Sequence, residues 1–241
     1  MSSYRIGCAG WSLPRPVQDA FPAEGTHLQR YARRFSAAEI NSSFYRQHRG
    51  ATYERWAAAV PAGFRFSVKV PKAITHEQRL VAADVLLDVF LSEATSLGEK
   101  LGCLLVQLPP SLAYDAPTAR SFFDDLRAQY DGVVALEPRH ESWFTADVTK
   151  RLRGYRIARV LADPAPVPEA AEPGGCDEIV YVRLHGSPQM YYSSYDDSYL
   201  DALAERLRGF ATLASQVWCI FDNTTLGAAT PNALALLERL P

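Results

Sequence analysis

The chain has 241 residues, of which 48% are hydrophobic and 22% are charged, and its formal net charge is −2. This composition excludes a disordered chain, and the nearly balanced charge argues against a surface that binds long nucleic acids. No apolar segment reaches the length of a membrane span or of a signal-peptide core, so we expect a cytoplasmic protein without a membrane partner. The length fits a single domain over residues 1–241.

Eight short apolar segments recur along the chain and predict eight buried strands. They span residues 4–8, 38–40, 64–70, 103–108, 133–136, 157–161, 179–184 and 217–221. Helical patterns lie between most of them, at residues 26–35, 53–60, 84–100, 117–129, 145–152 and 199–215, and a last helix is expected from Thr230 onward. Alternating strands and helices favour a mostly parallel sheet.

One connection lacks a helical pattern. Residues 164–177 contain Pro164, Pro166, Pro168 and Pro173 and a Gly-Gly pair, through which no regular helix can run. An open, doubly wound sheet is the competing architecture, but the turn after the first strand lacks its G-x-G-x-x-G sequence. We therefore predict an α/β fold, a TIM-type (β/α)8 barrel, in which the sixth crossover is irregular.

The cysteines and histidines show no spacing typical of a metal site. Cys8, Cys103, Cys176 and Cys219 are widely separated, and the chain contains neither H-x-H nor H-E-x-x-H. We expect reduced, mostly buried thiols and predict neither a metal nor a cofactor.

Polar side chains recur at alternate positions near the ends of the predicted strands, opposite the apolar ones. Because side chains alternate between the two faces of a strand, these groups are expected to point toward the barrel axis. TIM-barrel active sites lie at the C-terminal ends of the strands. The candidate acids and bases are Glu39, Glu137, His140 and His185. The candidate ligand-binding residues are Trp11, Asn41, Tyr45, Lys69, Gln107, Arg139, Arg183, Asp222 and Asn223.

A structural interpretation of the same charges stays open. Glu39, Lys69, Glu137, Arg139 and Arg183 can form a closed network of salt bridges that fills the barrel without serving a ligand. A barrel that needs only stability fills its interior with branched apolar residues, so we favour a functional site.

Specific words in the chain resemble a known family. They are I-G-C-A-G-W at residues 6–11, E-I-N-S-S-F-Y at 39–45, K-V-P-K-A-I-T-H at 69–76, L-V-Q-L-P-P at 105–110, E-P-R-H-E-S-W-F at 137–144, Y-V-R-L-H-G at 181–186 and F-D-N-T at 221–224. In this order they resemble the YecE-like family, the domain-of-unknown-function family 72. The resemblance implies a TIM-type barrel and no settled activity. Pro138 and Asp222 depart from the family pattern, which often has Phe and Asn there.

We expect acid–base chemistry on a small anionic molecule, such as a phosphorylated one. Arg139, Arg183 and Lys69 would hold the anion, near residues 185–187 and 223–227. One alternative is a metal-dependent hydrolase, whose ligands would come from the carboxylates and histidines, although the nearby cations disfavour a metal. Another is a non-catalytic module in which aromatic residues stack on a nucleotide or nucleic acid, which the net charge disfavours. The sequence does not indicate the oligomeric state.

Overall fold

The computed structural model describes residues 3–240, and its strands follow the predicted order. They are β1 (Ser3–Cys8), β2 (Ala37–Ile40), β3 (Arg65–Lys69), β4 (Leu101–Gln107), β5 (Val134–Glu137), β6 (Ile157–Arg159), β7 (Leu161–Asp163), β8 (Gly174–Gly175), β9 (Ile179–Leu184) and β10 (Gln216–Phe221). The sixth predicted strand is divided into β6 and β7, which only Val160 separates.

Seven α-helices are present among residues 3–240. They are α1 (His27–Tyr31), α2 (Gly50–Ala58), α3 (Asp84–Ala94), α4 (Ala116–Gln129), α5 (Ala146–Gly154), α6 (Asp197–Phe210) and α7 (Ala229–Leu237). Short helical turns are η1 (Arg15–Ala20), η2 (Ser42–Phe44), η3 (Ala73–Glu77), η4 (Thr95–Lys100), η5 (Glu141–Phe144) and η6 (Pro168–Ala171). No helix in this part of the chain is long and apolar enough to cross a membrane.

Local chemistry explains most helix boundaries. Thr26 begins α1 with a capping box, and Thr145 caps α5 through its side chain. The helix expected over residues 84–100 ends earlier, because Gly98 has a φ of 55° that an α-helix cannot accommodate. The expected cap at Thr230 is wrong: α7 begins at Ala229, and the Thr230 hydroxyl instead donates a hydrogen bond to the carbonyl of Ser12 at 3.0 Å.

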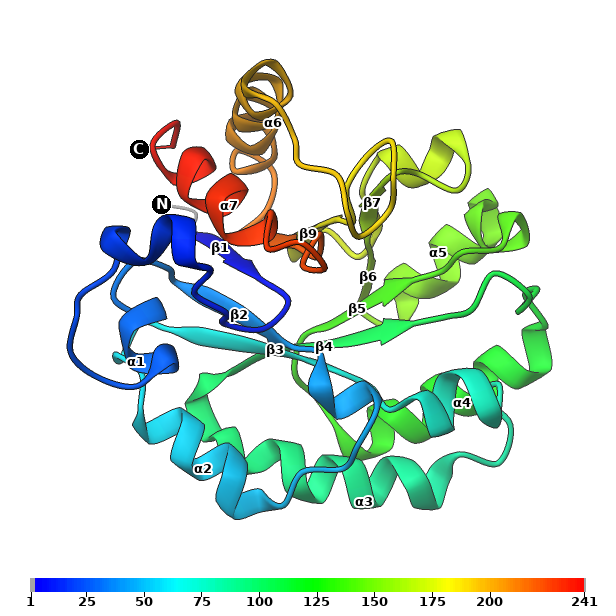
Figure 1. Cartoon of the computed structure of the whole chain (residues 1–241). Helices are drawn as coiled ribbons and strands as arrows, with labels where there is room; N and C mark the ends of the chain where they lie inside the picture. Colours follow the sequence, from blue (N-terminus) through cyan, green and yellow to red (C-terminus); the bar gives the residue numbers. More distant parts are fainter. Residues whose placement is uncertain (1–2, 241) are drawn as a thin grey trace.

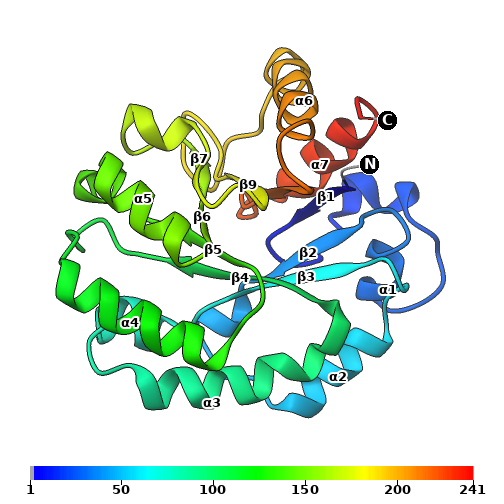
Figure 2. The ribbon, with the colours of Figure 1, turned by 180° about the vertical axis from the view of Figure 1, so that it is seen from behind.

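The strand pairings run around a ring. One parallel set follows the order β2-β3-β4-β5-β6, and the other follows β1-β10-β9-β7. Val160 joins β6 to β7, so one continuous segment pairs with β5 at its start and with β9 at its end. A bridge between Ala9 and Glu39 joins β1 to β2, which closes the predicted TIM-type barrel. Helices surround the strands, and α7 lies beside β1 (Figures 1 and 2).

Side chains replace backbone pairing along most of the contact between β1 and β2. The amide of Cys8 donates to the Tyr31 hydroxyl at 2.7 Å, and that hydroxyl donates to the carbonyl of Ala37 at 3.0 Å. Gly7 faces the same carbonyl so closely that a Cβ atom would lie 2.0 Å from it. The close approach of β1 to Ala37 therefore requires a residue without a side chain at position 7.

The sixth crossover is irregular, as predicted. Residues 164–177 hold only the short turn η6 and the two-residue strand β8, which pairs antiparallel with β6. The proline cluster accounts for this, because proline lacks the amide proton that a helix interior needs.

The barrel interior has an apolar floor. Tyr181 and Trp218 stack there with ring centroids 5.8 Å apart and planes 9° apart. Small residues on other strands, Cys103 and Ala135 among them, leave room for these rings. This lower part is filled, so the polar groups gather at the C-terminal ends of the strands above it.

Candidate functional site

Strand ends bring the charged groups together inside the barrel. Glu39 lies on β2, Lys69 ends β3, and Glu137 ends β5. Arg183 lies on β9 beside Ile220 of β10, and His185 and Asp222 follow the paired residues that end these two strands. These six residues are buried. Their shared strand parity therefore does direct them to one end of the barrel.

Arg183 is the centre of an ion network. Its Nη2 and Nε atoms donate to the two carboxylate oxygens of Glu39 at 2.7 and 3.0 Å. Nη1 donates to Glu137 Oε2 at 3.1 Å, and Nη2 also lies 3.0 Å from Asp222 Oδ2. All three nitrogens of the guanidinium are thus directed to protein carboxylates. In this geometry Arg183 holds three carboxylates together, and these contacts use most of its donor capacity.

His185 bridges two of the same carboxylates. Its Nε2 atom lies 2.9 Å from Glu137 Oε1, and its Nδ1 atom lies 3.0 Å from Asp222 Oδ2. Arg139 Nη2 lies 2.7 Å from the same Nε2 and 2.5 Å from Glu137 Oε1. A doubly protonated ring can donate to both carboxylates, whereas a neutral ring can accept from Arg139 at Nε2. Each ring nitrogen therefore has a hydrogen-bond partner within the protein.

The cations determine the charge of the carboxylates. Burial by itself would raise the pKa of Glu137, but Arg139, Arg183 and His185 outweigh burial and hold that pKa well below its usual range. Burial likewise opposes ionisation of Asp222, and Arg183 with the His185 hydrogen bond lowers its pKa nevertheless. Both side chains are therefore carboxylates at neutral pH.

Lys69 differs from the two arginines. Among residues 3–240, its ammonium makes no ion pair, and the contact it does make is with the ring of Phe44, whose centroid lies 4.0 Å away. Burial, followed by repulsion from Arg183, lowers the pKa of Lys69 to about 8, although Glu39 and the other carboxylates oppose the shift. Lys69 is thus a buried amine that is close to its own titration range at neutral pH.

Three predicted residues lie outside this network. His140 caps η5 by accepting from the amide of Ser142 at 3.2 Å. Trp11 packs edge-on against Trp56 at 5.2 Å, on the helix side of the sheet. Tyr45 is 68% exposed. Capping, packing and exposure account for these three without a ligand.

The predicted amides line the rim of the network or turn away from it. Gln107 pairs in register with Glu137, and its side chain donates to the carbonyl of Leu108 at 2.8 Å. Asn41 follows β2 and keeps a buried Oδ1 atom without a hydrogen-bond partner among residues 3–240. Asn223 donates to Asn232 Oδ1 at 3.0 Å, so its amide serves the start of α7.

Three amides of the loops after β9 and β10 donate to groups within the protein. The amide of Gly186 donates to the Tyr195 hydroxyl at 2.8 Å, and that of Thr225 donates to the carbonyl of Tyr191 at 3.2 Å. The amide of Gly227 donates to the carbonyl of Thr224 at 3.0 Å. These three amides are therefore already used within the protein, and a phosphate near residues 185–187 and 223–227 stays a prediction.

Sequence reasoning missed the aromatic and hydroxyl groups that support the network. The Tyr181 hydroxyl donates to Glu39 Oε2 at 3.1 Å and lies 2.8 Å from Ser67 Oγ. Tyr191 packs edge-on against His185 at 5.6 Å, with a positive φ of 69°. Strand parity places Tyr181 and Ser67 on the inner face, and it is the signal that could have added them to the predicted site. For Tyr191 the available signal is its position among the aromatic residues that follow the predicted strand of residues 179–184.

The side chains proposed as metal ligands in the metal-dependent alternative have other partners. Within residues 3–240, no group of three His, Cys, Asp or Glu side chains is arranged to hold a metal ion. Glu137 and Asp222 are directed instead to Arg183 and His185. The carboxylates thus have cationic partners within the protein.

The names of two curated relatives of this chain state no activity. The chain is 29% identical to the UPF0759 protein YecE of Escherichia coli K12 over 70% of its length, and the match covers 61% of that relative. It is 24% identical to the UPF0759 protein YunF of Bacillus subtilis, over 98% of this chain and 94% of the relative.

Solved structures share the fold. A DUF72 family protein from Thermotoga maritima matches with a TM-score of 0.82 and 23% identity, over 98% of each chain. Another from Enterococcus faecalis matches with a TM-score of 0.82 and 22% identity, over 99% of this chain and 95% of the other. The family model described as protein of unknown function DUF72 matches residues 5–241. The chain therefore belongs to the DUF72 family.

Proposed function

We propose that the barrel end performs acid–base chemistry on a small anionic molecule. The observation that carries this proposal is a buried ammonium, Lys69, that makes no ion pair among residues 3–240 and lies within electrostatic range of Glu137 and Asp222, the two carboxylates that His185 bridges. His185 is the acid–base group, and Glu137 and Asp222 orient its ring. Acid–base catalysis needs a side chain whose orientation is fixed by its neighbours.

The anion is assigned to Lys69 and Arg139. Arg183 directs all three of its nitrogens to carboxylates, whereas Arg139 has a buried Nε atom without a hydrogen-bond partner among residues 3–240. Asn41 lies two residues after Glu39, and its Oδ1, which has no partner in that range either, can accept from a hydroxyl group of the ligand. Two incompletely satisfied cations favour a phosphate or carboxylate group, which can accept several charge-assisted hydrogen bonds.

A structural role for part of the network is compatible with this proposal. Arg183, Glu39 and Tyr181 form a closed set of hydrogen bonds beneath the groups that we assign to the ligand. We assign a structural role to these three residues, so part of the salt-bridge network predicted from the sequence serves stability and not a ligand.

Thermal unfolding with candidate ligands tests the function. Phosphorylated and carboxylate metabolites are added to the wild type, to Lys69→Met and to Lys72→Met, which removes an exposed lysine paired with Glu77. A ligand at about 100 times its Kd raises the free energy of unfolding by about 2.7 kcal/mol. This increase should become smaller as the salt concentration rises, and of the two variants it should be lost only in Lys69→Met. A gain that survives in Lys69→Met contradicts the assignment. Destabilisation by a chelator, reversed by a divalent ion, would favour the metal-dependent alternative instead.

A further inference from the structure

We propose that Lys69 is an amine nucleophile that forms an imine with a small anionic carbonyl compound, such as a 2-oxo acid. The inference rests on the proposed function, in which Lys69 and Arg139 attract the anion: Arg139 holds the anionic group of the compound, and the neutral form of Lys69 attacks its carbonyl group. It goes further in assigning covalent chemistry and a substrate class. It stands on the position of Lys69 relative to its neighbours.

The first support is the absence of a counter-ion on Lys69 within residues 3–240. Glu39, Glu137 and Asp222 are all close enough to act electrostatically on its amine, yet each carboxylate is bonded to Arg183 instead. A lysine whose only role is structural is expected to donate to one of these oxygens. Here the amine remains available for another partner.

The second support is the position of Phe44. The Ser43 hydroxyl lies 2.7 and 2.6 Å from the carbonyl oxygens of Ile40 and Lys69 and can donate its proton to either, which fixes η2 against β3. This contact places the Phe44 ring over the Lys69 ammonium. The Phe44 ring excludes water from one side of the amine, which disfavours the charged ammonium. The effect is smaller than for an alkyl side chain, because the face of an aromatic ring attracts a cation.

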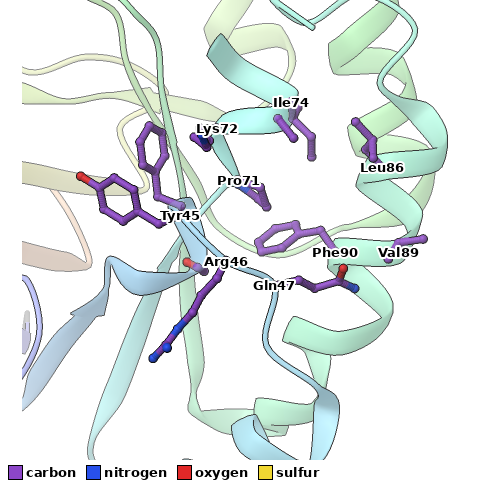
Figure 3. Close-up of a pocket in the computed structure, with 12 residues that line it drawn as sticks. Tyr45, Arg46, Gln47, Pro71, Lys72, Ile74, Leu86, Val89 and Phe90 are labelled. Carbon is purple, nitrogen blue, oxygen red and sulfur yellow. The ribbon is translucent and has the colours of Figure 1, made fainter. Parts of the chain in front are cut away.

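The third support is a cavity of about 160 Å³ on which Phe44 also borders. We call it the Phe44 groove, and its apolar walls include Phe44, Pro71, Ile74, Leu86, Val89 and Phe90. Figure 3 shows Leu86, Val89 and Phe90 of α3 facing Pro71 and Ile74, with the Tyr45 hydroxyl directed away from them. One ring thus contacts both the groove and the amine, so the groove offers a place for the apolar part of a carbonyl compound.

The chemistry balances with groups that are present. The lone pair of neutral Lys69 Nζ attacks the carbonyl carbon, and the carbonyl π electrons move to oxygen, which takes up the proton that the attacking nitrogen then releases. The resulting carbinolamine loses water after His185 supplies a second proton to its hydroxyl, which leaves a protonated imine. At pH 7 a lysine with a pKa of about 8 is neutral in about one molecule in ten, against about one in 2,500 for an ordinary lysine.

Reductive trapping tests this inference on the full-length protein. Glyoxylate or pyruvate is added at pH 7 with sodium cyanoborohydride, which reduces the imine to a stable secondary amine, and labelled peptides are identified by mass spectrometry. Lys72, Lys100 and Lys150 are internal controls, because Lys72 and Lys150 are exposed and Lys100 donates to a backbone carbonyl. We expect Lys69 to be labelled at least about tenfold faster than these controls, as its larger neutral fraction requires.

Two comparisons separate this inference from the proposed function. Lys69→Arg keeps the positive charge but lacks a primary amine, so it should retain anion-dependent stabilisation and lose the adduct. Glycolaldehyde, a neutral carbonyl compound, should label Lys69 more slowly than glyoxylate. Labelling of Lys69 no faster than that of the control lysines overturns the imine, even where phosphate still stabilises the protein. Equal labelling by both aldehydes keeps the imine and contradicts anion binding.

Discussion

Arg183→Met should destabilise the protein strongly, because it leaves buried carboxylates without their shared cation. The guanidinium bonds to Glu39, Glu137 and Asp222, and the whole set is almost inaccessible to solvent. Removing one partner of a buried ion pair costs about 3–5 kcal/mol, a large part of a typical stability of about 5–15 kcal/mol. We expect a loss of this size in denaturant unfolding at pH 7, with an unchanged m-value.

A matched control separates burial from charge. Arg206→Met removes an arginine whose ion pair with Glu172 is solvent-exposed, so it should cost less than about 1 kcal/mol. Glu137→Gln should cost less than Arg183→Met, because Glu39 and Asp222 still neutralise Arg183. If Arg183→Met changes stability no more than Arg206→Met, the network does not hold the fold together and our reasoning is refuted.

The loss should depend on pH in a stated direction. In the folded wild type the pKa values of Glu137 and Asp222 are lowered. The two ionised carboxylates therefore stabilise the fold above about pH 4, the pKa of a carboxyl group in the unfolded chain, and this stabilisation is lost as the pH falls through their pKa in the folded protein. In Arg183→Met burial acts without its counter-ion and should raise these pKa values instead. The difference in stability between the variant and the wild type should therefore shrink between pH 7 and about pH 5. A difference that stays constant over this range would contradict the electrostatic explanation.

Three further predictions concern the barrel and its thiols. Gly7→Ala should prevent close contact of β1 and β2, since its Cβ atom would lie 2.0 Å from the Ala37 carbonyl; a melting temperature equal to that of the wild type would disprove this. Tyr31→Phe leaves two backbone groups without their partner, so we expect a loss of about 1–3 kcal/mol and faster amide exchange at Cys8, and normal protection there would argue otherwise. In the native protein a thiol reagent should react rapidly with half-buried Cys176 alone. Burial raises the pKa of the Cys8 thiol to about 12, and Cys103 and Cys219 are also buried, so these three thiols should react only after denaturation.

Local patterns in the sequence were enough for the architecture and for the direction of the key side chains. The alternation along β9 placed Tyr181, Arg183 and His185 on one face because successive residues of a strand point to opposite sides. The prolines of residues 164–177 indicated the irregular crossover because their chemistry acts within one segment. These features depend on neighbours in the chain, which is why the sequence alone determined them.

Which charged side chains pair with one another inside the barrel depends on closure of the sheet. Arg183 and Glu39 are 144 residues apart, and only closure of the ring through β1 brings their strands to one axis. The same closure gives each carboxylate a cation and leaves Lys69 with the ring of Phe44 instead. Phe44 and Tyr45 are adjacent aromatic residues, and the turn η2 decides which one faces the site. Long-range electrostatics and the direction of a turn are properties of the assembled fold, so the tertiary structure alone decided which charges are paired and which amine is free.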